Sequence, residues 1–143
     1  MKLFDHIIKK GAEVTRIDGL LFPIFLVQNT MSEFILSSFK IERGWGNGYV
    51  GLPSWHPYYK KDYDSIPINC HYGLTFAELD EDEDLWVIGF DTAHSGDNKQ
   101  KWPKDAVQME CERIVEQCMN LKEAQRLVKL KKIAKINKSR KTR

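Results

Sequence analysis

The stretch "LWVIGFDTAHSGDN", residues 85–98, changes from apolar to polar at a single position. Its first half is nearly all bulky and apolar, which is typical of a strand covered on both faces by other parts of a protein. The polar half carries Asp91, His94 and Asp97, spaced three residues apart. The stretch therefore predicts a central strand over residues 85–91 that leads into a polar loop.

Apolar segments before this strand predict the rest of the sheet. Residues 68–77 alternate apolar and polar side chains, which predicts a strand. The acid-rich residues 78–84 predict a solvated turn between that strand and the one at residues 85–91. We also expect an extended segment over residues 19–27 and a strand over residues 34–42.

Glycines are concentrated in "GWGNGYVGLP", residues 44–53. Asn47-Gly48 predicts a hairpin, because a type I′ turn needs positive φ at both central residues. The glycines at 46, 48 and 51 also match the Gly-x-Gly-x-x-Gly pattern of dinucleotide-binding loops, in which a helix begins at the third glycine. Leu52-Pro53 follows here without helical periodicity, so we do not expect such a loop.

A helix is expected to begin near Pro103, because proline is favoured in the first turn. An apolar stripe then recurs at spacings of 4, 3, 4 and 3 residues, at Val107, Cys111, Ile114, Cys118 and Leu121. The helical pattern continues into residues 122–136, and a short helix is expected over residues 3–10. These elements predict an α+β fold: an antiparallel sheet of about four to five strands packed against a long C-terminal helix.

Composition and charge divide the chain into an acidic body and a basic tail. Of the 143 residues, 42% are hydrophobic and 29% charged, as in ordinary folded proteins. Residues 1–119 carry a net charge of −7 and are expected to form one globular α+β domain. Residues 120–143 carry a net charge of +9 and are expected to form a basic helical extension with a disordered tail at residues 137–143.

The same totals favour a cytoplasmic protein without membrane contact. The sequence has no apolar run of the roughly 18 residues that a membrane span requires. Its first residues lack the apolar centre and small-residue cleavage site of a signal peptide. Cys70, Cys111 and Cys118 have no zinc or redox spacing, and we expect Cys111 and Cys118 to pack in the core as small apolar groups.

Polar side chains from three segments could converge where the strand at residues 85–91 ends: His56, His71, Asp91, His94 and Asp97. Asp91 is expected to organise the loop by accepting the N–H groups of Ala93 and His94. Asp97 could close the turn at Gly96 or pair with His71. His94 lies between two small residues, so its ring is expected to face outward and to take part in binding with His71 and Asp97.

The same cluster has a catalytic alternative. Imidazole and carboxylate groups are ligands of Zn²⁺ and Mn²⁺, so His71, Asp91, His94 and Asp97 could form a metal site. A metal-bound water would then make the protein a hydrolase. Because the sequence has no H-E-x-x-H, H-x-H or C-x-x-C spacing, we expect no metal cofactor, and we favour binding over catalysis.

A second candidate surface lies in the aromatic segment 54–63. Trp55, His56, Tyr58 and Tyr59 are followed by two lysines, a mixture suited to stacking on a base or to anchoring a protein partner. The alternative is that Trp55 and Tyr58 cover the edge of the sheet.

The basic tail has three interpretations. It could attract nucleic acid through phosphate contacts, dock on the acidic body of another copy, or maintain solubility. Apolar residues at Leu127, Leu130, Ile133 and Ile136 favour a packing role, so we expect the chain to form a homo-oligomer.

The middle of the chain resembles an uncharacterised family of small bacteriophage and prophage accessory proteins. The resemblance rests on "GNGYVGLPSWHPYY", "DYDSIPINCHYGLTF", "LWVIGFDTAHSGD" and "VQMECERIVEQC", over roughly residues 46–118. Its most specific part is the block W-x-x-G-F-D-x-A-H-x-G-D. The resemblance implies a protein that acts in the host cytosol by binding a host protein or a small ligand, such as a nucleotide, to counter host defence. Tyr72 departs from the family pattern, which usually has glycine at this position.

Overall fold

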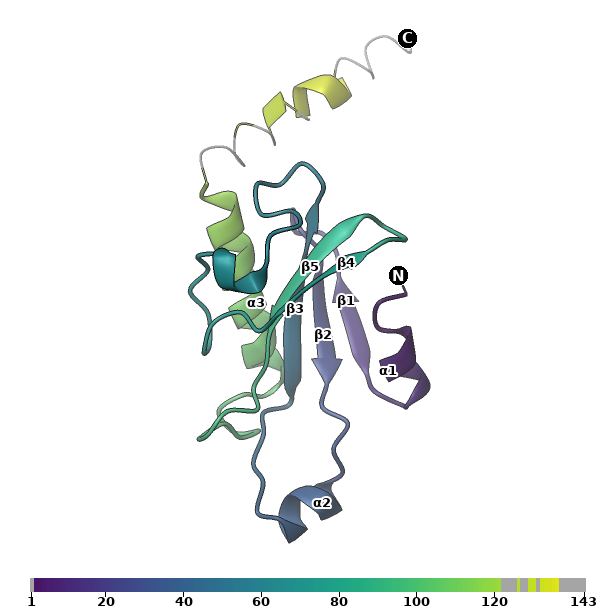
Figure 1. Ribbon diagram of the computed structural model, residues 1–143, viewed down its shortest axis with the longest axis vertical. Helices are drawn as coiled ribbons and strands as arrows, with labels where there is room; N and C mark the ends of the chain where they lie inside the picture. Colours follow the sequence, from purple (N-terminus) through teal and green to yellow (C-terminus); the bar gives the residue numbers. More distant parts are fainter. Residues whose placement is uncertain (1, 122–125, 127–128, 131, 137–143) are drawn as a thin grey trace.

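A five-stranded antiparallel sheet forms the centre of the protein in a computed structural model that describes residues 2–121, 126, 129–130 and 132–136 (Figure 1). The strands lie in the order β1-β2-β3-β5-β4. The elements in chain order are α1 (Asp5–Lys9), β1 (Val14–Ile17), β2 (Ile24–Gln28), α2 (Glu33–Ser38), β3 (Gly46–Pro53), a 3₁₀ turn (Tyr63–Ser65), β4 (Phe76–Asp80), β5 (Leu85–Phe90) and α3 (Lys104–Met119). The α+β fold with an antiparallel sheet is therefore confirmed.

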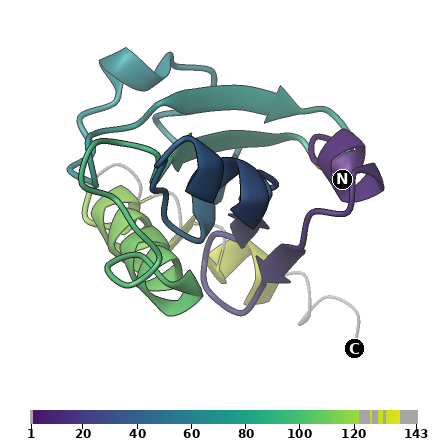
Figure 2. The ribbon, with the colours of Figure 1, turned by 90° about the horizontal axis from the view of Figure 1, so that it is seen from below.

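Helices α3 and α1 cover opposite faces of the sheet (Figures 1 and 2). Along β2, Ile24 and Leu26 pack in the same core cluster as the stripe of α3, whereas Phe25 and Val27 pack with Phe4 beside α1. This alternation follows from the two-residue period of a strand. The predicted α3 stripe is confirmed, since its members at 107, 111, 114 and 118 are all fully buried.

Strand β5 is buried and pairs on both sides, with β3 and with β4. This confirms the central strand predicted over residues 85–91, which ends one residue earlier, at Phe90. The turn that precedes it is exposed at residues 81–84, as expected, while β4 extends into the acidic segment as far as Asp80.

The predicted hairpin at Asn47-Gly48 is wrong, because both residues lie inside β3 and pair with β2. Gly48 is needed there for space. A Cβ atom at this position would lie 2.4 Å from the Cys111 Sγ atom and 2.7 Å from the Phe90 ring. Gly51 is followed by more of β3, so the expectation that no nucleotide-binding helix begins there is confirmed.

The strand predicted over residues 34–42 is also wrong, because residues 33–38 form α2. Ser32 caps this helix, with its Oγ accepting a 3.2 Å hydrogen bond from the N–H of Ile35. Phe39, which follows the helix, is 71% exposed. Helix α2 projects beyond the strands at the end of the sheet where β5 finishes (Figure 1).

The strand predicted over residues 68–77 is confirmed only at its end, where β4 begins at Phe76. Ile68 and Cys70 are buried as the pattern predicted, but they lie outside the strands. The chain turns at Tyr72 and Gly73, which have φ angles of 55° and 79°. Both values fall in the left-handed region, which ends an extended segment.

The long C-terminal helix is not confirmed. Helix α3 has 16 residues and ends at Met119. Among the later residues that the structure describes, 126, 129–130 and 132–136 are helical and exposed. Leu127 and the tail predicted at residues 137–143 lie outside the described residues. No helix within the described part of the chain is both long and apolar enough to span a membrane.

Candidate functional site

The polar loop, residues 91–99, begins where β5 ends and is fixed to β3 by Thr92. The Thr92 hydroxyl donates a 2.7 Å hydrogen bond to the backbone oxygen of Gly46, and the Thr92 backbone oxygen accepts a 2.8 Å bond from the N–H of Gly44. Thr92 is 2% exposed. These bonds replace the strand pairing that the backbone loses after Phe90, so the loop leaves the sheet in a defined direction.

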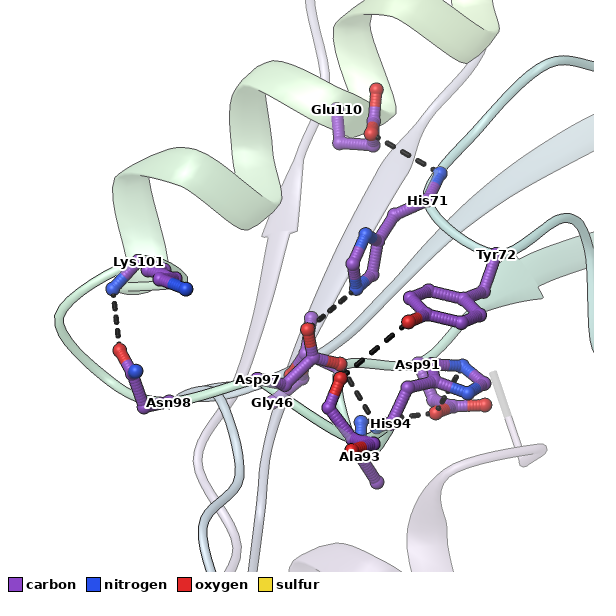
Figure 3. Close-up of polar contacts among 12 residues, drawn as sticks. Gly46, His71, Tyr72, Asp91, Ala93, His94, Asp97, Asn98, Lys101 and Glu110 are labelled. Carbon is purple, nitrogen blue, oxygen red and sulfur yellow. Dashed lines mark hydrogen bonds and ion pairs between the residues drawn. The ribbon is translucent and has the colours of Figure 1, made fainter.

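Asp97 is the buried carboxylate that organises this loop (Figure 3). Its Oδ2 atom accepts a 2.9 Å hydrogen bond from the N–H of His94, and its Oδ1 atom lies 2.8 Å from the Nε2 atom of His71. The Asp97 N–H in turn donates a 2.9 Å bond to the His94 carbonyl. The expected turn around Gly96 and the expected pairing with His71 are both confirmed.

Asp91 has a smaller part in the loop than the sequence predicted. Its Oδ1 atom accepts a 3.1 Å hydrogen bond from the N–H of Ala93, as expected, and its Oδ2 atom accepts a 3.0 Å bond from the Thr75 hydroxyl. The predicted bond from the N–H of His94 is wrong, because that group donates to Asp97 instead. The more buried of the two carboxylates takes this donor.

The ring of His94 lies against Asp91 and Tyr72. Its Nε2 atom is 3.0 Å from Asp91 Oδ1, close enough for an ion pair when the ring is protonated, but the angle does not make a hydrogen bond. The His94 and Tyr72 rings are stacked, with centroids 4.1 Å apart and an interplanar angle of 5°. His94 is thus partly enclosed rather than turned fully outward as the sequence predicted.

His71 is fixed from several directions. Its ring packs on Trp102 with a centroid separation of 4.3 Å, in addition to the contact with Asp97. Its backbone N–H donates a 3.2 Å hydrogen bond to Glu110, a buried residue of α3 that also pairs with Arg113. The turn that carries His71 is therefore attached both to the polar loop and to α3.

A basic cavity of about 640 Å³ lies between the polar loop and the chain at residues 36–43, which includes the end of α2 and the segment after it. Its charged side chains are Lys40, Arg43, Lys99 and one carboxylate, Glu42, and His94 also lines it. The remaining lining residues are Leu36, Ser37, Ile41, Ser95, Gly96 and Asn98. Cations thus outnumber carboxylates by three to one in the lining.

Lys40 and Arg43 are the cations most available in this cavity. Within the part of the chain that the structure describes, neither forms an ion pair with a carboxylate. Arg43 also borders a second hollow of about 300 Å³, which is lined by Asp91 and Ala93 among others. Arg43 therefore borders both recesses beside the polar loop.

His56 does not join the other four candidate residues. It is 3% exposed, and its Nε2 lies 3.0 Å from the backbone oxygen of Cys118 in the last turn of α3. Its Nδ1 accepts a 3.0 Å hydrogen bond from the N–H of Tyr58, so Nε2 carries the proton that is donated to Cys118. The polar loop leads instead to the first turn of α3, and Lys104 at the start of this helix is about 21 Å from Cys118 along the helix axis at 1.5 Å per residue.

The other aromatic candidates of residues 54–63 pack against the sheet. Tyr58 is 7% exposed, and Trp55 packs against the main core cluster. The Tyr59 hydroxyl bonds to Asp84, and the indole N–H of Trp86 donates a 2.8 Å bond to the Lys61 carbonyl. These contacts favour the alternative in which this segment covers the sheet edge.

The structure also shows which groups near His71, Asp91, His94 and Asp97 could bind a metal or act as a nucleophile. In the described residues, no three His, Cys, Asp or Glu side chains are grouped so as to hold a metal ion. The nearest thiol, Cys70, is buried, and this burial raises its pKa to about 11. A thiol with such a pKa is almost entirely protonated at neutral pH and is a poor nucleophile.

Lys40, Arg43, Thr92 and Glu110 were not singled out by sequence reasoning. Lys40 belongs to the segment 34–42 that was predicted as a strand, and Arg43 directly follows it, so their position beside the polar loop could not be inferred. Glu110 is not a member of the apolar stripe predicted for α3. In the structure it is buried beneath the turn of His71, which a helical period alone does not reveal.

Comparisons of the chain with protein-family models, with curated proteins and with solved structures find no match.

Proposed function

We propose that the chain is a non-catalytic binding protein whose basic cavity holds a small, negatively charged ligand of the phosphate-bearing class. The observation that carries this proposal is the lining of the cavity, which includes the cationic side chains of Lys40, Arg43 and Lys99 and the carboxylate of Glu42. Its volume of about 640 Å³ is within the range typical of small-molecule sites.

The position of Arg43 supports this ligand class. Its guanidinium group has five N–H donors, and its fork geometry suits two oxygen atoms of one phosphate. Among the described residues, no carboxylate forms an ion pair with Arg43 or Lys40, so a ligand bound to these two side chains displaces no such pair.

The rigidity of the polar loop supports binding by a preformed site. Asp97 holds the loop through the N–H of His94 and holds His71 at the same time. Preorganisation of this kind lowers the entropy that a ligand must overcome on binding. His71 and Asp97, the two most buried polar side chains of the cluster, are thus paired with each other. This pairing favours a structural role for them over a catalytic one.

The family resemblance gives this proposal a biological setting. We propose that a phage accessory protein of this kind withholds its ligand from a host component, and that the binding step alone is sufficient. Action in the host cytosol and a role against host defence belong to the same proposal.

The charge of the cavity provides the test. Pyrophosphate titrated into the protein should shift the amide resonances of residues 40–43 and 94–99, and the affinity should fall as salt is raised. Lys40→Glu combined with Arg43→Glu should abolish the shifts. Lys9→Glu combined with Lys10→Glu makes the same change in net charge at α1 and should leave them in place. Equal binding by both double variants, or no binding by the unmodified protein, would overturn the proposal.

A further inference from the structure

We infer that the ligand carries a sugar next to its phosphate, and that the second hollow beside the basic cavity holds this sugar. The inference rests on the proposed function and specifies its ligand. It is carried by Arg43, which lines both the basic cavity and the second hollow. The polar loop also lines both, with residues 91–93 on the second hollow and residues 94–96, 98 and 99 on the basic cavity. The two recesses are therefore neighbours along the same loop.

Arg43 can contact a ligand from either recess. Its side chain is half-buried and forms no hydrogen bond or ion pair within the part of the chain that the structure describes. A guanidinium group has five N–H donors in a planar fork, so it can bond to two adjacent groups of one ligand. A phosphate in the basic cavity and a hydroxyl group in the second hollow could thus both contact Arg43. The part of the ligand in the second hollow is then the part next to its phosphate.

The polar groups of the second hollow suit hydroxyl groups. Arg43 is a donor, Asp91 is an acceptor, and the side-chain amides of Asn29 and Asn47 are both. A hydroxyl group also donates and accepts, so the hydroxyls of one sugar can bond to this mixed set. A second phosphate would instead be repelled by the Asp91 carboxylate. The volume of about 300 Å³ is at the lower end of small-molecule sites, which suits one part of a ligand.

Asp91 and Asn29 can accept these bonds without losing their present contacts. The Asp91 carboxylate accepts hydrogen bonds from the Ala93 N–H and the Thr75 hydroxyl and lies beside His94 (Figure 3). A carboxylate has about four lone-pair sites, and the Asp91 side chain is 29% exposed. The Asn29 side-chain oxygen accepts a 3.0 Å bond from a backbone N–H, and its amide nitrogen donates no bond to any described residue.

Two phosphate monoesters test the inference, because methyl phosphate and ribose 5-phosphate differ in the sugar. Amide chemical-shift titrations should give an affinity for ribose 5-phosphate that is about 5- to 100-fold stronger, as two additional hydrogen bonds would supply. The side-chain amide resonances of Asn29 and Asn47 should shift with ribose 5-phosphate and not with methyl phosphate. Equal affinities, or no shift at these two side chains, would overturn the inference about the sugar but not the proposed function. Failure of both probes to bind would overturn both.

A large side chain placed in the second hollow separates its role from that of the cavity. Ala93 is exposed and lines the hollow, so Ala93→Phe should fill it and reduce the affinity for ribose 5-phosphate to that for methyl phosphate. Gln100→Phe adds the same ring at an exposed position directly after the polar loop that lines neither recess, and it should keep the preference. Loss of the preference in both variants, or in neither, would overturn the inference. Thermal melts show whether the variants fold, and the Asn29 and Asn47 shifts test the inference even if Ala93→Phe does not.

Discussion

The Nε2 atom of His71 and the Oδ1 atom of Asp97 lie 2.8 Å apart, although 26 positions separate the two residues in the sequence. This contact joins the turn before β4 to the polar loop after β5. The two segments border neighbouring antiparallel strands, so the end of one strand lies beside the start of the other. The His71–Asp97 pair therefore fixes the turn before β4 to the polar loop after β5.

Asp97→Ala should destabilise the protein more than Asp91→Ala. The Asp97 side chain is 4% exposed, and its loss leaves His71 Nε2 and the N–H of His94 without their acceptor. A buried unpaired group costs roughly 1–3 kcal/mol, so we expect a loss of at least about 2 kcal/mol. Asp91 is 29% exposed, and water can replace its bonds at about 1 kcal/mol or less. Urea denaturation measures both, and equal losses would contradict this order.

His56→Ala should lower stability without changing ligand binding. The substitution removes the donor to the Cys118 carbonyl and the acceptor of the Tyr58 N–H, at a cost of about 1–3 kcal/mol. His56→Gln keeps a side-chain N–H and should recover part of the loss. Thermal melts and pyrophosphate titrations of the folded variants check this. A variant that folds normally but binds less pyrophosphate would restore His56 as a binding residue.

Periodicity and apolar runs predicted the elements that are long and buried. The apolar stripe of α3 and the apolar residues of β5 are both buried over several residues. Both elements could therefore be predicted from the sequence. Helix α2 was missed because Phe39 and Ile41 alternate with polar neighbours as in a strand, yet they are 71% and 37% exposed. The start of α2 is marked by a single capping contact of Ser32. In so short a helix, this cap is the main feature of the sequence that indicates a helix.

The candidate site was only partly predictable for a related reason. His71, Asp91, His94 and Asp97 follow or precede buried strands, and this position allowed their grouping to be anticipated. The basic cavity depends on how the chain after α2 returns past the polar loop, more than 50 positions away in sequence for Lys40 and Ser95. The types of side chain alone do not indicate that these two distant segments lie side by side.

Gly48→Ala should destabilise the protein more than Gly51→Ala, although both lie in β3. The new Cβ at position 48 would meet the Cys111 Sγ atom at 2.4 Å and the Phe90 ring at 2.7 Å, between the sheet and α3. Overpacking of this kind costs about 1–3 kcal/mol. At position 51 the nearest atoms are side-chain tips at 3.1 and 3.2 Å, which can shift. Denaturant midpoints of the two variants provide the measurement, and a reversed order would contradict this account of the strand.

Alkaline pH should destabilise the protein through its buried thiols. Burial raises the pKa of Cys70 to about 11 and that of Cys118 to about 12, from an ordinary value of 9.0. The unfolded chain therefore loses these protons first, so stability is complete below about pH 9 and falls as pH rises toward 11 and 12. Urea denaturation from pH 8 to pH 10.5 should show this fall. Cys70→Ala should make it shallower, whereas an unchanged slope would show that other groups cause it.

The chain should form an oligomer through its C-terminal segment. Leu130, Ile133 and Ile136 recur every three residues in helical conformation and are 53%, 53% and 52% exposed. Apolar side chains that are adjacent on a helix and open to water favour association. Light scattering at micromolar concentration should thus give a mass above the 16.7 kDa of one chain. Replacing all three residues by glutamine should reduce the mass to that of a monomer, and replacing Lys129 by glutamine should not. A monomeric unmodified protein would contradict the prediction, and an oligomer that survives the triple substitution would place the interface elsewhere.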